Sequence, residues 1–110
     1  MKFLKIEVFI PREDTKKLIK KINEGGFLRE ENYDFCYAET PVTGHFRPIE
    51  GANPYIGSLG KIEDVLENKV EFRIRKSDLD EVMKIIKKNH PYEVPVINVI
   101  ELFNDWFKLQ

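Results

Sequence analysis

Apolar and polar residues alternate along two stretches of the chain, which is the pattern of a half-buried β-strand. In residues 3–10 the apolar positions that share one face are Leu4, Ile6, Val8 and Ile10. In residues 61–76 they are Val70, Phe72 and Ile74. The pattern predicts two amphipathic strands, and Pro11 should end the first of them.

Apolar residues three and four positions apart predict a helix after each of these strands. From Glu13 to Glu24 the buried stripe consists of Leu18, Ile19 and Ile22. Gly25 and Gly26 should end this helix, because glycine takes the left-handed cap position without strain.

The second helix has a stripe that consists of Leu79, Val82, Met83 and Ile86. Ser77 is expected to be its N-cap, with Asp80 in the first turn, where an acidic side chain is favoured. The helix must stop by His90, because Pro91 disfavours helical geometry in the residue before it.

Two further stretches are predicted to be strands. In residues 33–39 the aromatic side chains of Tyr33, Phe35 and Tyr37 alternate with Cys36 and Ala38. Val94–Phe103 is apolar enough to be a central strand. Beyond it, Trp106 and Phe107 form an aromatic pair that needs cover from the sheet or from a neighbouring subunit.

An internal repeat indicates how these elements are joined. A shift of 64 residues, from Glu7 to Glu71, aligns Glu7–Ile22 with Glu71–Ile86. Each copy reads strand, helix, strand, and two such units with right-handed crossovers fold most simply into one antiparallel sheet with both helices on one face. The sequence therefore predicts an α+β, ferredoxin-like (βαβ)2 sandwich that forms a single domain over residues 1–110. The opposite face of its sheet would need a cover.

The stretch Gly44–Gly60, which reads GHFRPIEGANPYIGSLG, lacks periodicity over most of its length and predicts a long loop. It contains one of the two histidines and much of the chain's glycine. Loops of this length without internal structure tend to be functional or mobile. We therefore expect function to involve this loop and the short run His90–Glu93, which reads HPYE.

Composition narrows the class of protein. Basic and acidic residues nearly cancel, 18 against 19, so the net charge of −1 gives no global reason to bind nucleic acid or an anionic membrane. The lysine-rich face of the first helix lacks interleaved aromatic residues and indicates a solvated surface. The single cysteine, Cys36, fits a reducing compartment. No apolar run approaches the roughly 18 residues of a membrane span, and MKFLKIEVFI has charges inside it, unlike a signal peptide. We expect a cytoplasmic protein.

The loop does not contain a P-loop. That motif would need glycine at position 55 and serine or threonine at 62, where the chain has Tyr55 and Ile62. Two alternatives stay open: a looser anion site of backbone N–H groups, helped by Arg47 or Lys61, or glycines that only let the loop turn.

The candidate metal ligands are His45, His90, Cys36 and Glu93. None has the spacing of a local motif, so a site would have to assemble across the fold or across a subunit boundary. His90 and Glu93 together suit zinc or a similar divalent ion. The alternative is that His90 contacts the last carbonyls of its helix.

Catalytic templates have little support. The chain has no G-x-S-x-G sequence, and Cys36 in mid-strand would be a small buried hydrophobe. The acidic residues after the loop indicate a solvated strand face: Glu63, Asp64 and Glu67.

The motifs GHFRPIEGANPYIG (44–57), GKIEDVLE (60–67) and HPYE (90–93) together resemble the inserted middle domain of the YqfO-type proteins, the Nif-three-like group often labelled as GTP-cyclohydrolase-type-two homologues. The resemblance runs from the first strand to about Leu102. It departs at Val94, where many relatives have a second acidic residue.

The resemblance implies a CutA/PII-like fold and a homo-oligomer, with a trimer favoured. The larger relatives place this insert between two halves that carry a dinuclear metal centre, and this chain has too few histidines to rebuild it, so their metal-dependent activities are not transferred. By analogy with PII-like trimers, Thr43–Gly60 and His90–Glu93 would line a ligand cleft between subunits.

Two hypotheses of function follow. The first is a non-catalytic, oligomeric module that binds a small molecule or a metal ion, or regulates a protein partner, through His45, Arg47, Glu50, Asn53, His90 and Glu93. The alternative is a metal-dependent, hydrolase-like enzyme with its site at a subunit interface. The sequence does not identify a cofactor, and a divalent metal ion is the one candidate. A purely structural domain, whose motifs serve packing, is a third reading.

Overall fold

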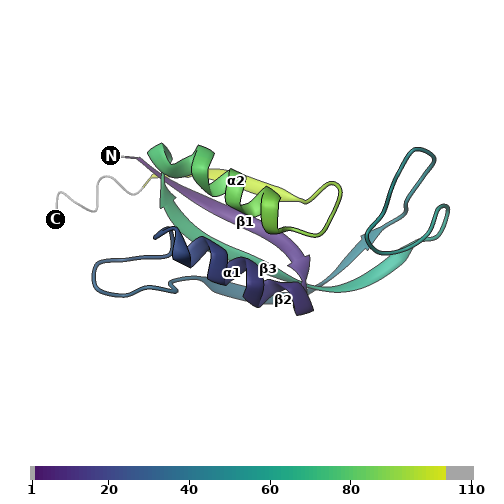
Figure 1. Cartoon of the computed structure of the whole chain (residues 1–110), viewed down its shortest axis with the longest axis horizontal. Coiled ribbons are helices and arrows are strands. Elements are labelled where there is room, and N and C mark those ends of the chain that lie inside the picture. Colours follow the sequence, from purple (N-terminus) through teal and green to yellow (C-terminus); the bar gives the residue numbers. More distant parts are fainter. Residues whose placement is uncertain (1, 104–110) are drawn as a thin grey trace.

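The computed structural model describes residues 2–103. Its elements are β1 (Phe3–Pro11), η1 (Arg12–Asp14), α1 (Thr15–Glu24), β2 (Ala38–Phe46), β3 (Glu63–Arg75), η2 (Lys76–Asp78), α2 (Leu79–Asn89) and β4 (Ile97–Leu102). The strands form one antiparallel sheet in the order β2-β3-β1-β4. Both helices cover the same face of this sheet (Figure 1). The predicted ferredoxin-like (βαβ)2 fold is confirmed.

The repeat has a direct counterpart in the register of the two central strands. Glu7 of β1 lies opposite Glu71 of β3, the residue onto which the repeat maps it. A pseudo-two-fold axis therefore passes through this pair. Two like charges facing each other would destabilise the sheet, but Lys5 contacts both carboxylates, at 3.2 Å from Glu7 and 3.0 Å from Glu71. Its hydrogen bonds lower the pKa of both carboxyl groups.

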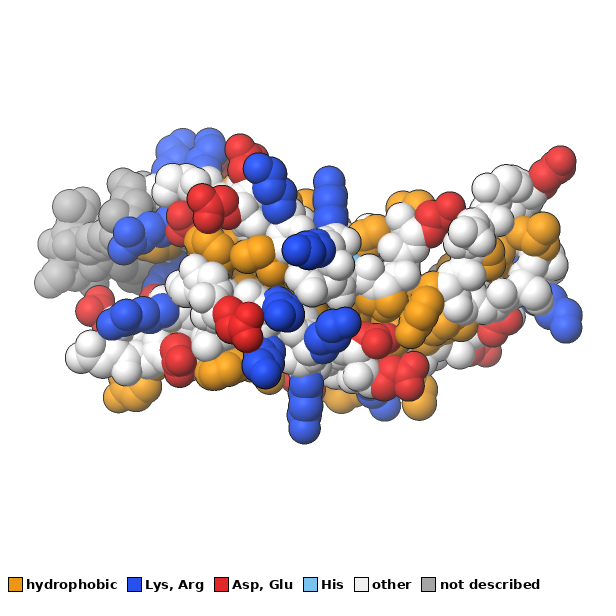
Figure 2. Space-filling view, in the orientation of Figure 1, with side chains coloured by type: hydrophobic (Ala, Val, Ile, Leu, Met, Phe, Trp, Pro, Cys, Tyr) orange, Lys and Arg blue, Asp and Glu red, His pale blue; other side chains and the backbone are white. Residues whose placement is uncertain are grey.

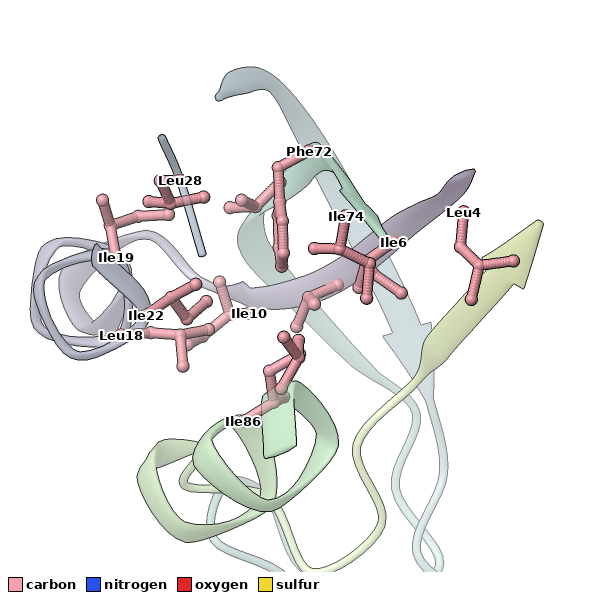
Figure 3. Packing of buried hydrophobic residues seen from close by; sticks show 13 residues of the cluster. Leu4, Ile6, Ile10, Leu18, Ile19, Ile22, Leu28, Phe72, Ile74 and Ile86 are labelled. Carbon is pink, nitrogen blue, oxygen red and sulfur yellow. The ribbon is translucent and has the colours of Figure 1, made fainter. Parts of the chain in front are cut away.

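The core lies between the sheet and the helices, and the predicted apolar stripes form it. Leu18 and Ile22 of α1 and Ile86 of α2 point towards side chains of the central strands such as Ile6 and Ile10 (Figure 3). All five of these side chains are 0% exposed. The first helix ends as predicted, with Gly26 in the left-handed conformation at φ +83°, and α2 ends before His90.

The prediction of a strand over residues 33–39 is wrong, because β2 begins only at Ala38. Phe35 has a left-handed backbone, with φ +50°, that no strand can contain. Its N–H donates to Asn23 Oδ1 at 2.8 Å, and the N–H of Cys36 donates to the Leu28 carbonyl at 2.9 Å. These bonds hold the segment as a loop, with Cys36 half-buried in it and not in a strand.

Two other predictions about secondary structure need correction, and a third concerns residues outside 2–103. The last strand is shorter than Val94–Phe103, and β4 is an edge strand, so apolar composition did not indicate a central position. Ser77 is not the N-cap of α2, because the 3-10 turn η2 precedes the helix and puts Asp78 there. Trp106 and Phe107 lie outside the described residues.

The β2–β3 hairpin extends beyond the rest of the sheet as an arm. Pairing between β1 and β3 begins at Pro11 and Glu67, whereas pairing between β2 and β3 continues to Phe46 and Glu63. Gly44, His45 and Phe46 therefore belong to a strand and not to the loop predicted from residue 44 onward. The remaining loop, residues 47–62, closes the arm at its far end from the helices (Figure 1). Within residues 2–103, neither helix has the length and apolar character to cross a membrane.

Candidate functional site: a cleft beneath the arm

A cleft of about 420 Å³ lies where the arm meets the segment that links α2 to β4. We call it the arm cleft. Apolar and aromatic side chains from four parts of the chain form its walls, among them Phe9, Phe46, Tyr55, Ile56, Tyr92 and Val96. Figure 2 shows hydrophobic side chains gathered where the arm joins the body of the molecule. The volume lies within the range of small-molecule sites.

His90 fixes the segment that forms one side of the cleft. It is the C-cap residue of α2 and is 7% exposed. Its Nε2–H donates to the Phe9 carbonyl at 2.7 Å, and its Nδ1 accepts from the Tyr92 N–H at 3.1 Å. Because β4 pairs with β1 only as far as Val8, the imidazole satisfies a strand carbonyl that β4 leaves unpaired. The alternative prediction was that His90 contacts the last carbonyls of its own helix. It is wrong, because the carbonyl that His90 contacts belongs to β1. Both ring nitrogens are engaged within the chain.

Burial makes the stability of the fold depend on the charge of His90. The pKa of His90 is lowered from its usual 6.5, chiefly because burial disfavours the charged ring. Below about pH 6.5 the unfolded chain takes up a proton that the folded chain resists, so this contribution to stability is full above that pH and is lost as pH falls. The pKa values of Glu7 and Glu71 are also lowered, but from their usual 4.5, so these two groups change the stability only at lower pH.

We therefore expect the free energy of unfolding to fall between about pH 7.5 and about pH 5.5. In His90→Gln, which keeps a donor for the Phe9 carbonyl but cannot titrate, the stability should be lower at pH 7.5 and its pH dependence flatter. Urea unfolding at a series of pH values measures this slope. His45→Gln removes the other imidazole and is the control. A slope that persists in His90→Gln would contradict the assignment.

Tyr92 and Glu67 form the polar floor of the cleft. The Tyr92 hydroxyl donates to Glu67 Oε2 at 2.6 Å. Burial, with the contact to Glu67, raises the pKa of the Tyr92 hydroxyl. Glu67 is 5% exposed, so its prediction as part of a solvated strand face is wrong. The cause is the segment between α2 and β4: its Tyr92 contacts Glu67. The Tyr92 ring packs against Phe46 and Tyr55, at centroid distances of 6.0 and 6.3 Å.

The structure brings the long loop and the HPYE run together within one chain. The Asn53 N–H donates to Glu93 Oε1 at 3.0 Å, which ties the loop to the segment after α2. Arg47 and Glu93 line the arm cleft. The sequence predicted that these two segments line a cleft between subunits. In the structure, residues of both segments line a cleft within one chain.

The remaining predicted site residues differ in their placement. His45 lines the cleft from β2, and its Nδ1 lies 2.7 Å from Asp64 Oδ1 on an exposed surface. Glu50 is exposed in the loop and is not among the residues that line the cleft. Among residues 2–103, no three His, Cys, Asp or Glu side chains gather in a way that could hold a metal ion. A metal site that uses His45, His90 or Glu93 stays a prediction that needs donors from another chain.

Comparisons with known proteins support the same architecture. A family model described as CutA1 divalent ion tolerance protein matches residues 57–106. A Staphylococcus aureus (strain Mu50) protein named GTP cyclohydrolase 1 type 2 homolog is 39% identical over 100 residues, which are 91% of this chain and 27% of that protein. The crystal structure of a Bacillus cereus protein related to NIF3 superposes with a TM-score of 0.80 at 30% identity, over 94% of this chain and 26% of that one.

CutA1 from Oryza sativa superposes with a TM-score of 0.71 at 20% identity, over 99% of this chain and 87% of that one. The fold is CutA/PII-like. At 20% identity the likeness to CutA1 shows the fold alone, whereas the sequence similarity is to one segment of longer proteins. The chain spans about a quarter of the length of the curated relatives it matches, 27% in the case above.

Proposed function

We propose that this chain is a non-catalytic ligand-binding and regulatory module with a CutA/PII-like fold, whose ligand site is the arm cleft. The observation that carries the proposal is a largely apolar cleft that residues of loop 47–62 and of the segment 90–96 line together. Such a cleft, with a few polar groups at its floor and rim, is the usual form of a small-molecule site.

The loop is suited to respond to a bound molecule. Few bonds hold it, among them the Gly60 N–H to the Pro48 carbonyl at 2.7 Å and the Asn53 N–H to Glu93. Segments with few buried contacts open at low free-energy cost. A ligand that contacts both the loop and the HPYE run would order the arm, and this change in the arm is the signal that a regulatory module needs.

The proposal includes assembly into a homo-oligomer, with a trimer as the expected state, in the cytoplasm. The face of the sheet opposite the helices presents partly exposed side chains, and β2 and β4 are edge strands. Edge strands pair readily with further chains. A protein partner of the assembled module is part of the same proposal.

A thermal-shift screen against nucleotides, metabolites and divalent metals tests the proposed function, together with light scattering on the eluting protein. We expect a trimer at micromolar concentration, and at least one small molecule that raises the unfolding temperature. A ligand at 100 times its dissociation constant stabilises the fold by about 2.7 kcal/mol.

The shift should be lost in Tyr55→Ala, which removes a wall of the cleft, and kept in Tyr33→Ala, which removes an exposed aromatic side chain elsewhere. If light scattering shows a monomer, the proposed homo-oligomer is wrong. A shift that survives Tyr55→Ala would place the site outside the cleft. Stabilisation by a divalent metal alone, reversed by a chelator, would favour the metal-dependent alternative.

A further inference from the structure

The floor of the arm cleft holds a buried carboxylate without a cationic partner. Glu67 is 5% exposed, and its Oε2 accepts from Tyr92, yet among residues 2–103 no cation forms an ion pair with its carboxylate. Arg12 donates to the Glu67 backbone carbonyl at 3.2 Å, not to the side chain. A buried carboxylate is costly unless hydrogen bonds or a counter-ion satisfy it, and it has room for about four hydrogen bonds.

A second acidic side chain, that of Asp14, lies near the cleft and interacts with Tyr55. Asp14 Oδ2 is buried and has no hydrogen-bond partner among the described residues. Its charge is the main cause of the raised pKa of Tyr55 and contributes to that of Tyr92. Two acidic groups therefore act on the tyrosines of the cleft, and the excess negative charge favours an occupant that is positively charged or rich in N–H donors.

The walls select for a flat apolar body. Rings from Phe9, Phe46, Tyr55 and Tyr92 line the cleft. Aromatic faces attract cations and stack on planar groups. A planar group with two N–H donors on one edge can also form a bidentate, charge-assisted pair with a carboxylate.

We propose that the arm cleft binds a small planar aromatic molecule with a cationic nitrogen group, for which the Glu67 carboxylate is the counter-ion. The inference rests on the proposed function, since it takes the arm cleft to be the ligand site, and it adds the charge and the shape of the ligand. A free anion such as inorganic phosphate does not fit this floor, although Arg47 lines the cleft.

Three probes of nearly equal shape test the inference on the wild-type chain: benzamidine, which is cationic, benzamide, which is neutral, and benzoate, which is anionic. Titration followed by amide chemical shifts in NMR gives both affinity and location. We expect benzamidine to shift the signals of Phe46, Tyr55 and Tyr92, and to bind roughly tenfold or more tightly than benzoate, as expected for one charge-assisted contact. Benzamide should fall between them.

Glu67→Gln keeps the size of the side chain and an acceptor for Tyr92 but removes the charge. It should weaken benzamidine roughly tenfold and leave benzamide unchanged, whereas Glu39→Gln, on an exposed part of β2, should change neither. Because the three probes are compared on the wild type, the test stands even if Glu67→Gln does not fold.

Benzoate that binds as tightly as benzamidine, or benzamidine that binds outside the cleft, would overturn the inference while leaving the proposed function to its own screen. No binding of any probe, together with a screen without hits, would overturn both.

Discussion

Ile22→Ala and Ile86→Ala should each lower the free energy of unfolding by about 2–5 kcal/mol, the range for removing a fully buried isoleucine. Both side chains are 0% exposed, and each belongs to one helix of the repeat. Because the repeat places them at equivalent positions of its two halves, the two costs should be similar.

Urea unfolding followed by circular dichroism, at one fixed protein concentration, measures both costs. Ile62→Ala is the matched control, because Ile62 is 72% exposed, and it should change stability by no more than about 0.5 kcal/mol. If one core variant were nearly neutral while the other was severe, the two halves would not share a single core, and the architecture drawn from the repeat would be wrong.

The elements that the sequence predicts well are those that bury one face. In β1 and β3, each apolar residue of the alternating pattern is buried, because a strand that packs on two helices must place every second side chain in the core. The helical stripes succeed for the same reason. The spacing of apolar residues therefore predicts these elements correctly because it reflects which side chains the core buries.

The same pattern fails where no face is buried. Tyr33, Phe35 and Tyr37 alternate as in a strand, yet Tyr33 is 75% exposed and the segment is a loop. What decides its conformation is a contact between distant residues, the Phe35 N–H with Asn23 Oδ1, which no local pattern contains. The edge position of β4 is likewise a property of the sheet as a whole.

Two segments that line the arm cleft were singled out from the sequence, whereas the buried carboxylate of the cleft was not. Glycine and proline content marks the long loop, and the HPYE run marks its partner, and the structure joins them through Asn53 and Glu93. Glu67 was missed because a charged residue on the solvent side of a strand has the same local pattern whether or not a distant segment, here that of Tyr92, covers it. A signal was available in Tyr92, whose hydroxyl needs a partner once its ring is buried.

Gly44→Ala should destabilise the arm, with an expected cost of about 1–3 kcal/mol. Gly44 packs against the Glu67 carboxylate, and an added Cβ would overlap Oε1 and lie 2.6 Å from Cδ. Its φ is not in the left-handed region, so the backbone accepts alanine and the cost arises from the side-chain contact alone. Thr43→Ala, at the exposed neighbouring position, is the control and should be nearly neutral.

A double-mutant cycle identifies the contact responsible. In Glu67→Ala the carboxylate is gone, so adding Gly44→Ala to that variant should cost much less than it does in the wild type, with a coupling energy of about 0.5–3 kcal/mol. Equal costs in both backgrounds would show that the glycine is required for another reason. The cycle also bears on the cleft, because in wild type the Glu67 carboxylate, which accepts from Tyr92, lies where a side chain at position 44 would be. If the cost does depend on Glu67, the absence of a side chain at position 44 is part of what positions the carboxylate at the floor of the arm cleft.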